Sequence, residues 1–391
     1  MAVPLQSDVP TFVAPAHEQL AYVPGSIVVG LHEDTSEPFD YLRREAGAHT
    51  LESLDDNLRV VEIDEHAVSP QLLRTVESSP AVAFAERMPA RWLSVDQAAD
   101  PRHNRQWGLR AIRWFDAGTP DAAAVTVAIC DTGVDERHPD LAAAIASYDH
   151  EGASADDIVG HGTHVSGIVA GRNDDAAGVV GVAGCRVAMW KVFPDQPNQG
   201  NFYVDGTAFL RALNAVATSG AKVLNLSLGG TQSSQAEQLL FERLERAGVT
   251  VVAAMGNEHD HGNPVEYPAA YDHVLAVGAV AETNRRSPFS NTGPHIGIAA
   301  PGSNVLSTLP TKPSPYRPDT AYASWSGTSM ATPHVSAAAA LVAAQHPDWT
   351  PADTKEHLRA RAAKVADMDG QSFTEGFGSG LLDIASLAAS D

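Results

Sequence analysis

Continuous apolar runs of strand length are the feature that most restricts how this chain can fold. Residues 125–130 and 250–255 carry hydrophobic side chains at almost every position instead of at every second one. A strand that is apolar on both sides is covered on both faces, which is typical of a parallel sheet. Helical patterns alternate with such runs, for example at residues 208–218 and 235–247. The alternation predicts an α/β fold with helices on both faces of a central parallel sheet.

Asp131 ends the first of these runs, directly before a Thr-Gly turn. The carboxyl ends of parallel strands meet at one edge of the sheet, and α/β proteins place their sites at this edge. Residues 161–164, His-Gly-Thr-His, come thirty positions later and have the pattern of a helix start. Asp131 is therefore expected at the end of a strand, and His161 at the start of a helix. His164 lies one turn further along the same helix and is expected to be a packing residue.

Ser329 lies among small residues at the expected start of another helix, in the segment 326–334. A helix N-terminus offers unpaired backbone N–H groups and the positive end of the helix dipole, which suit a site where negative charge develops. We expect Pro333 to lie in the first helical turn, where no backbone N–H is required. Taken alone, such a segment is more often an ordinary helix cap.

These three segments, in the order Asp, His, Ser, resemble the signature blocks of the subtilisin-like serine proteases (subtilases, peptidase family S8). The matching residues are 131–133, 161–164 and 327–331, and the resemblance spans roughly residues 98 to 389. It implies a three-layer subtilisin-like fold and a serine endopeptidase that works through an acyl-enzyme. Ser329 would attack the scissile carbonyl, His161 would accept and return its proton, and Asp131 would hold the imidazole.

A fourth segment, residues 250–258, is similar to the family segment that carries the oxyanion asparagine. The resemblance implies that Asn257 donates its side-chain amide to the tetrahedral intermediate, together with the backbone N–H of Ser329. The alternative is that Asn257 closes the strand through an Asx-turn.

Substrate is expected to bind along residues 221–230, which are similar to the family segment whose edge pairs with an extended peptide. Glu266 stands where the family usually has a small or neutral residue, at the floor of the pocket for the residue before the cut. A carboxylate there would favour a substrate Lys or Arg. The alternative is that Glu266 turns outward in a solvated loop. The pocket walls would be formed by Ser227, Leu228 and Gly229 on one side and by residues from Ala254 to Asn257 on the other.

Residues 22–93 are expected to form a separate α+β unit with the order strand, helix, strand, strand, helix, strand, the split ferredoxin-like arrangement. The unit is similar to the inhibitory prodomain (inhibitor-I9-like) of secreted subtilisin-like enzymes. This resemblance implies a zymogen whose prodomain acts as an intramolecular inhibitor until the enzyme cuts its own chain between Arg91 and Asp100. Residues 1–21 would then be an N-terminal tail, and residues 98–391 the catalytic domain.

A structural calcium ion is the cofactor that the resemblance implies, and no catalytic cofactor is expected. Family members often hold the ion between an N-terminal carboxylate, an acid after the catalytic strand and a surface loop. The matching positions are Asp100, Asp140 and the loop 173–179, where Asp174 or Asp175 would supply the side-chain ligand. The loop is one residue longer than the usual pattern, which leaves that ligand ambiguous. A solvated acidic turn is the alternative.

The chain is strongly acidic, because 48 Asp and Glu against 26 Lys and Arg give a net charge of −22. This balance disfavours nucleic acid as a partner, since phosphate contacts need basic patches. An acidic, lysine-poor surface keeps a protein soluble at high salt. The composition is therefore halolysin-like and suggests a halophilic source, with an ordinary acidic protein as the alternative.

No run of 18 apolar residues occurs, so no membrane span is expected. The expected state is a monomer that acts on proteins and peptides.

Cys130 and Cys185 are too few to define a disulfide framework. We expect two reduced, buried thiols, with a single bridge as the alternative. Residues 1–8 lack the basic and apolar regions of a secretory signal. The family resemblance nevertheless favours a secreted enzyme, with an enzyme that acts inside the cell as the alternative.

Two other classes of function compete with a serine protease. A silent member of the family used for binding is disfavoured, because all four catalytic positions hold the expected residue types. A metal-dependent hydrolase would draw on the sixteen histidines and the cluster 259–261, but no His-Glu-x-x-His pattern occurs.

Overall fold

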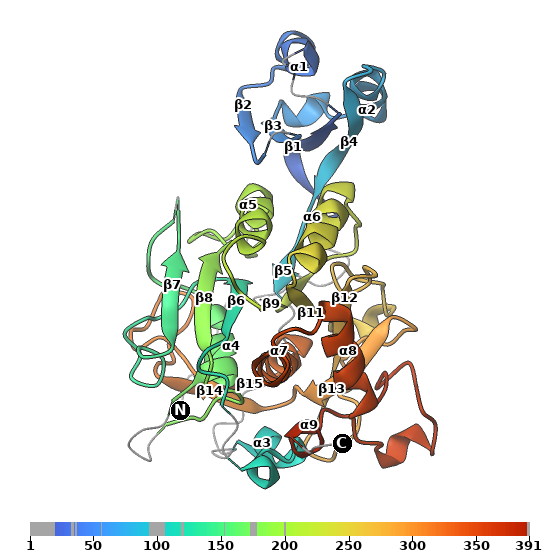
Figure 1. The fold of residues 1–391 in the computed structure, drawn as a ribbon. Helices are drawn as coiled ribbons and strands as arrows, with labels where there is room; N and C mark the ends of the chain where they lie inside the picture. The colour runs from blue at the N-terminus through green and yellow to red at the C-terminus, as the bar shows by residue number, and fades with distance from the viewer. Residues whose placement is uncertain are drawn as a thin grey trace, which may run out of the picture.

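The computed structural model describes residues 20–32, 35, 37–55, 57–93, 106–118, 121–151, 153–172, 178–198 and 201–388. These residues form a small N-terminal unit and a larger unit on which it sits (Figure 1). Among them, no helix is both long enough and apolar enough to cross a membrane.

The N-terminal unit is an antiparallel sheet of four strands, in the order β2-β3-β1-β4, with two helices packed on it. Its own core is formed where Ile27 and Val29 of the central strand meet Phe39 and Leu42 of the first helix. The elements are β1 (Tyr22–Leu31), α1 (Glu37–Ala46), β2 (Thr50–Ser53), β3 (Leu58–Glu62), η1 (Glu65–Ala67), α2 (Pro70–Glu77) and β4 (Val82–Pro89).

The larger unit is built on a sheet of seven strands, and every neighbouring pair in it is parallel. This confirms the central parallel sheet that the continuous apolar runs predict. In spatial order the strands are β13 (Ile296–Pro301), β12 (Val274–Val280), β11 (Thr250–Ala254), β9 (Val223–Leu226), β6 (Thr126–Asp131), β8 (Arg186–Lys191) and β7 (Ile145–Asp149).

Helices cover both faces of this sheet. α4 and α7 pack against each other on one face, whereas α5 and α6 pack together on the face toward the N-terminal unit (Figure 1). The confirmed fold is therefore a three-layer α/β fold. The helices of the larger unit are α3 (Trp107–Ala111), α4 (His161–Ala170), α5 (Gly206–Val216), α6 (Gln235–Arg246), α7 (Thr328–Gln345), α8 (Pro351–Ala360) and α9 (Ile384–Ala388), with the short 3-10 turns η2 (Trp114–Ala117), η3 (His259–His261) and η4 (Ala366–Met368).

Two short strand pairs lie outside the main sheet. β14 (Val305–Thr308) and β15 (Tyr322–Trp325) form an antiparallel pair beside α4. β5 (Trp92–Leu93) follows β4, which leads from the N-terminal unit down to the larger one (Figure 1). β5 pairs antiparallel with β10 (Leu228–Gly229), so the end of the N-terminal unit contacts the edge where substrate is expected.

The distance from the start of α7 to Pro333 is about one helical turn longer than the sequence predicts. Its first residue is Thr328, so Pro333 lies inside the helix and the expectation of a first-turn proline is wrong. A proline lacks the N–H that would bond to the carbonyl four residues earlier, here the carbonyl of Ser329. That carbonyl accepts a hydrogen bond from Ser227 Oγ at 2.9 Å instead.

The two cysteines confirm the expectation of buried, reduced thiols. Cys130 lies in the middle of the central sheet and Cys185 lies just before β8, and both are free. Burial raises the pKa of the Cys185 thiol to about 12 and raises that of Cys130 further. Both thiols are therefore held in their neutral form.

Candidate active site

Asp131 and His161 meet at the carboxyl edge of the sheet. β6 ends at Asp131, and α4 begins at His161. Nδ1 of the imidazole lies 2.7 Å from Oδ1 of the carboxylate, and both side chains are fully buried. Because a carboxylate only accepts hydrogen bonds, Nδ1 carries the proton and Nε2 is left as an acceptor. This Nε2 is buried and has no partner among the described residues.

The start of α4 is held by Asp157, a residue that the sequence analysis does not identify. Its carboxylate accepts from the Gly160 N–H at 2.8 Å and from the Thr163 N–H at 2.9 Å. The hydroxyls of Thr132 and Thr163 donate to the same carboxylate at 2.8 and 2.6 Å. Asp157 thus ties the turn after β6 to the first turn of α4. An aspartate four residues before the helix is the signal that could have revealed it.

His164 confirms its expected packing role. Its ring stacks on Trp325 with centroids 4.9 Å apart, and Nε2 donates to the Ala323 carbonyl at 3.1 Å. Burial lowers the pKa of His164 to about 3, so this ring stays neutral. Trp325 also lies nearly parallel to the His161 ring, at 6.4 Å between centroids.

Ser329 lies in the first turn of α7 and is completely buried. Its Oγ donates to the Ser227 carbonyl at 2.8 Å, while Ser227 Oγ donates back to the Ser329 carbonyl at 2.9 Å. Asn225 extends this pair, because its Nδ2 donates to Ser227 Oγ at 3.0 Å. The reciprocal bonds join the start of α7 to the segment between β9 and β10.

Asn257 follows β11, and its side-chain oxygen accepts from both the backbone N–H and the hydroxyl of Thr328 at 2.9 Å. These bonds fix the amide, so that its Nδ2 is turned away from Thr328. The Nδ2 group is buried and has no partner among the described residues. The Asx-turn alternative does not describe this side chain, whose bonds run to α7 and not to its own turn.

Glu266 is buried, so the alternative in which it turns outward is wrong. Its carboxylate lies against the Cα atoms of Gly229 and Gly256, where a side chain at either glycine would collide with it. Asn291 Nδ2 donates to one of its oxygens at 3.0 Å. Burial and the neighbouring Glu258 carboxylate raise the pKa of Glu266 well above its ordinary range. The carboxyl therefore sits between the two expected walls of the pocket.

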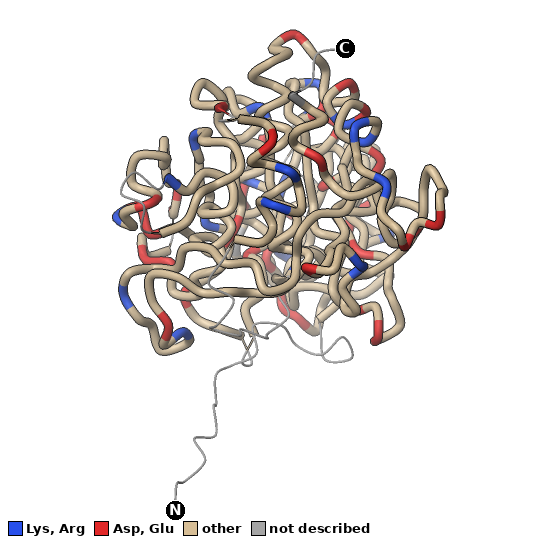
Figure 2. Tube along the Cα trace, turned by 90° about the horizontal axis from the view of Figure 1, so that it is seen from below, with Lys and Arg blue, Asp and Glu red and all other residues tan. Residues whose placement is uncertain are grey.

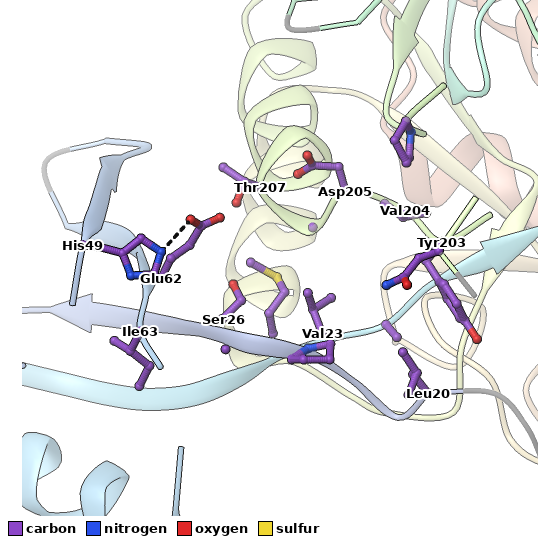
Figure 3. A pocket seen from close by; sticks show the side chains of 17 residues that line it. Leu20, Val23, Ser26, His49, Glu62, Ile63, Tyr203, Val204, Asp205 and Thr207 are labelled. Atoms are coloured by element: carbon purple, nitrogen blue, oxygen red, sulfur yellow. Dashed lines mark ion pairs between the residues drawn. The ribbon is translucent and has the colours of Figure 1, made fainter. Parts of the chain in front are cut away.

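The four expected wall residues are brought together and are all buried: Ser227, Leu228, Gly229 and Ala254. Leu228 and Gly229 are paired with Leu93 and Trp92 of β5, so the edge is already occupied by this chain's own residues. A hollow lies at the junction of the two units, where Tyr203, Val204 and Asp205 face Val23 and Glu62 (Figure 3). None of the candidate catalytic residues lines that hollow, so it is separate from the candidate active site.

The expected calcium ligands are only partly described. Asp140 is buried at 4% exposure, and its Oδ2 accepts from the Val179 N–H at 2.9 Å. Asp100, Asp174 and Asp175 lie outside the described residues. Within the described part, no group of three or more His, Cys, Asp or Glu side chains could hold a metal ion.

The arrangement combines a base with a free acceptor, a hydroxyl at a helix start, and a fixed amide donor. Such a set suits acyl transfer, in which a hydroxyl attacks a carbonyl and an oxyanion forms. As the second residue of α7, Ser329 has a backbone N–H without a partner inside the helix. That N–H is a second donor beside the amide of Asn257.

Known proteins match most of this chain. The subtilase family of peptidases (Peptidase S8) matches residues 122–380. Subtilisin from Bacillus pumilus is 35% identical over 268 residues, which cover 68% of this chain and 90% of that protein. An alkaline protease from Shouchella clausii is 34% identical over 336 residues, 85% of this chain and 78% of that protein.

A solved structure extends the similarity to the fold. The crystal structure of fervidolysin from Fervidobacterium pennivorans, a keratinolytic enzyme related to subtilisin, superposes with a TM-score of 0.76 at 25% identity. The superposition covers 94% of this chain and 61% of the fervidolysin chain. This chain therefore spans about three fifths of that longer protein.

Proposed function

The chain belongs to the subtilase family of serine-type endopeptidases, and we propose that Ser329, His161 and Asp131 hydrolyse peptide bonds in protein and peptide substrates. The observation that carries the proposal is the buried contact of 2.7 Å between Asp131 and His161. It fixes the tautomer in which Nε2 is free to accept a proton. Ser329 lies in the first turn of α7, and α7 packs against α4, which carries His161. A free Nε2 is what a general base for that serine requires.

In the proposed first step, Ser329 Oγ turns from the Ser227 carbonyl to Nε2 of His161 and gives up its proton as it attacks the scissile carbonyl. The C–N bond then breaks, the leaving amine takes the proton from His161, and the acyl group stays on Ser329. Water repeats the attack with His161 as base and releases the acid. Asp131 stabilises the imidazolium in both steps.

The oxyanion of each tetrahedral intermediate would be bound by Asn257 Nδ2 and by the Ser329 backbone N–H. Support comes from Thr328, whose two bonds hold the Asn257 amide in place before substrate arrives. A donor that is already oriented stabilises charge without reorganisation.

Residues 22–93 are proposed to be an inhibitory prodomain of a self-processed zymogen. Two contacts support this assignment. β5 occupies the substrate edge at β10, and Glu86 of β4 caps α6 by accepting from Ser234 Oγ and the N–H groups of Gln235 and Ala236. The match to the alkaline protease covers 85% of the chain. Residues 98–391 alone are 294 of 391 residues, or about 75%, so the similarity reaches into this unit.

The pocket for the residue before the cut is proposed to prefer Lys or Arg. The buried carboxylate of Glu266 supports this preference, because a cation that enters the pocket would pair with a group that has no basic partner at hydrogen-bond distance among the described residues. The charge pair would form in a partly dry cavity, where it is stronger than in water.

A structural calcium ion is also proposed. Asp140 is a buried carboxylate without a Lys, Arg or His partner within the described part of the chain, which fits a cation ligand. Asp100 and either Asp174 or Asp175 would complete the carboxylate set. Carboxylate and carbonyl oxygens are the ligands that calcium prefers, and the ion would stabilise the fold without acting in the reaction.

Labelling with a serine-directed fluorophosphonate tests the catalytic assignment. The native protein should be labelled at Ser329, and its activity should not respond to a zinc chelator. Ser329→Ala and His161→Ala should each lose roughly 10⁶-fold in kcat, a magnitude that comes from subtilisin itself. Ser326→Ala is the matched control and should remain active. Labelling without peptide hydrolysis would identify a silent binding protein, and zinc-dependent hydrolysis would identify a metal-dependent hydrolase.

Mass analysis of the purified chain tests the zymogen. The native protein should shorten to a product that begins between Arg91 and Asp100, whereas Ser329→Ala should persist at full length. Identical processing of both proteins would rule out self-cleavage.

A further inference from the structure

A buried ion pair joins the tail of the proposed prodomain to the larger unit. Arg91 Nη2 lies 2.6 Å from Oε2 of Glu237, and the two side chains are 1% and 3% exposed. Tyr271 donates its hydroxyl to the same carboxylate oxygen at 3.0 Å. The guanidinium Nε has no partner among the described residues. Arg91 thus fills a closed pocket in which its hydrogen-bonded acid partner among the described residues is Glu237, while the Glu266 carboxylate lies near enough to feel its charge.

Arg91 reaches this pocket from the substrate edge. It directly precedes β5, in which Trp92 faces Gly229 and Leu93 faces Leu228. On its other side, the Arg91 carbonyl accepts from the Val204 N–H at 2.8 Å. The tail is therefore held between two segments of the larger unit as an extended strand.

The register of β5 defines which position of a substrate would enter the pocket. Because Trp92 faces Gly229, the preceding residue faces Gly230, and the guanidinium lies close to this glycine. A substrate strand in the same register would place its arginine three positions before the residue that faces Ser227. The Ser227 carbonyl contacts Ser329 Oγ, so the residue that faces it is the one before the cut.

Glu237 is permanently part of this pocket, whereas Arg91 is not. The glutamate lies in the first turn of α6 and stays in place when the tail is removed. Burial raises the pKa of Glu237, and the charge of Arg91 opposes this effect. A carboxyl that has lost its cation in a closed pocket binds a new cation strongly, since an unpaired buried charge is costly. A planar guanidinium, which can bind a carboxylate through two N–H groups, fits this demand better than an ammonium.

We propose that Glu237 forms a specificity pocket for arginine at the fourth residue before the scissile bond, and that Arg91 occupies this pocket in the zymogen. The inference rests on the proposed function, because it takes the tail as an imitation of substrate. The ligand is the arginine side chain of an extended peptide. Glu237 binds this side chain and takes no part in the chemical step.

Cleavage of matched peptides by the processed enzyme tests the pocket. The peptides carry Arg, Lys, Leu or Glu at the fourth position before the cut and are otherwise identical. We expect kcat/KM for the Arg peptide to exceed that for the Leu peptide by on the order of 100-fold, since a site built to bind a polar group rejects an analogue that lacks it. Glu237→Gln should remove most of this difference and leave cleavage of the Leu peptide almost unchanged.

The controls separate specificity from stability. Glu242→Gln removes an exposed carboxylate from the same helix and should keep the Arg preference. Should Glu237→Gln fail to fold or mature, the double variant Arg91→Leu with Glu237→Leu replaces the ion pair by apolar side chains of similar volume, which buried pairs often tolerate. It should mature and prefer the Leu peptide.

Two results would overturn the inference. One is equal cleavage of the Arg and Leu peptides by a native enzyme whose activity depends on Ser329, which leaves the proposed function intact. The other is an Arg preference that Glu237→Gln leaves unchanged. Absence of Ser329-dependent cleavage of every peptide would overturn the proposed function, and this inference with it.

Discussion

At the scale of single residues, two buried polar atoms of the site, His161 Nε2 and Asn257 Nδ2, have no partner within the described residues. Leaving a buried polar atom unpaired costs about 1–3 kcal/mol. Other bonds of the same side chains fix the orientation of these atoms: the imidazole donates through Nδ1 to Asp131, and the amide oxygen of Asn257 accepts from Thr328. Each free atom is therefore oriented before substrate binds.

Removing the amide donor should slow the reaction without removing substrate binding. We expect Asn257→Ala to lower kcat by about 10²–10³-fold, a range that comes from subtilisin, while KM changes little. Thr328→Val keeps the amide but removes one of its two supporting bonds and should have a smaller effect. Steady-state kinetics on one peptide substrate checks both variants. A variant Asn257→Ala with native kcat would show that the amide does not bind the oxyanion.

Glu266 should make the substrate preference depend on pH. Its raised pKa means that the carboxyl is neutral at low pH and ionises only as the pH rises above the ordinary range of a glutamate. The ratio of kcat/KM for an Arg peptide to that for a Phe peptide, varied at the residue before the cut, should therefore increase with pH, by at least about tenfold.

Taking this ratio cancels the protonation of His161, which affects both peptides equally. Glu266→Gln should give a ratio that does not change with pH. A clear Phe preference that this variant leaves unaltered would exclude a role of Glu266 in specificity.

The residues of the site differ in how far sequence could predict them. Asp131, His161, Ser329 and Asn257 each lie within a short segment whose pattern marks the end of a strand or the start of a helix. The buried position of Glu266 depends on the backbone of two other segments. Glu237 gives no local signal at all, because it has the pattern of an ordinary acidic first turn of a helix and its partner Arg91 lies 146 positions away.

At the scale of elements, the two helices of the site, α4 and α7, begin differently from α5, α6 and α8. α5, α6 and α8 are capped by the side chains of Asp205, Ser234 and Thr350. α4 and α7 begin after glycines, which supply no side-chain cap. Side chains from elsewhere take this role, namely Asp157 for α4 and Asn257 for α7. Asp157 lies close to α4 in the sequence, whereas Asn257 lies 71 positions before Thr328, so local patterns could reveal the first contact but not the second.

Asp157 should be important for both stability and activity. Asp157→Ala removes an acceptor for four donors at the start of α4, so we expect a loss of about 2–4 kcal/mol in the free energy of unfolding. The first turn of α4 carries His161, so kcat should fall as well. Urea unfolding in a Ser329→Ala background, where self-digestion is absent, measures the first effect.

The neighbouring Asp156 supplies the control for this prediction. Its side chain is exposed, so Asp156→Ala removes the same charge without removing the cap. Equal losses of stability in the two variants would show that charge, and not the hydrogen bonds of Asp157, is responsible.

At the scale of the whole molecule, calcium is expected to stabilise the fold. An ion at 100 times its dissociation constant adds about 2.7 kcal/mol to the free energy of unfolding. A calcium chelator should therefore lower the melting temperature of the Ser329→Ala protein by several degrees, and added calcium should restore it. Asp140→Asn should reduce the response, and magnesium should not replace calcium. A melting temperature that the chelator leaves unchanged would argue against the site.

The charge of the whole chain predicts how salt affects stability. Acidic residues occur all around the molecule in Figure 2, with fewer basic residues between them, in agreement with the net charge of −22. Such an excess of one sign destabilises the compact state through self-repulsion, and salt screens this repulsion, with a Debye length that falls from about 30 Å at 0.01 M to about 3 Å at 1 M. We expect the midpoint of thermal unfolding of Ser329→Ala to rise by several degrees between these two concentrations of potassium chloride.

An equal osmolality of a neutral solute is the control, because it changes the solvent without screening charge. Greater stability at low salt would contradict the halophilic source that the composition suggests. An equal response to the neutral solute would show that charge screening is not the cause of the stabilisation.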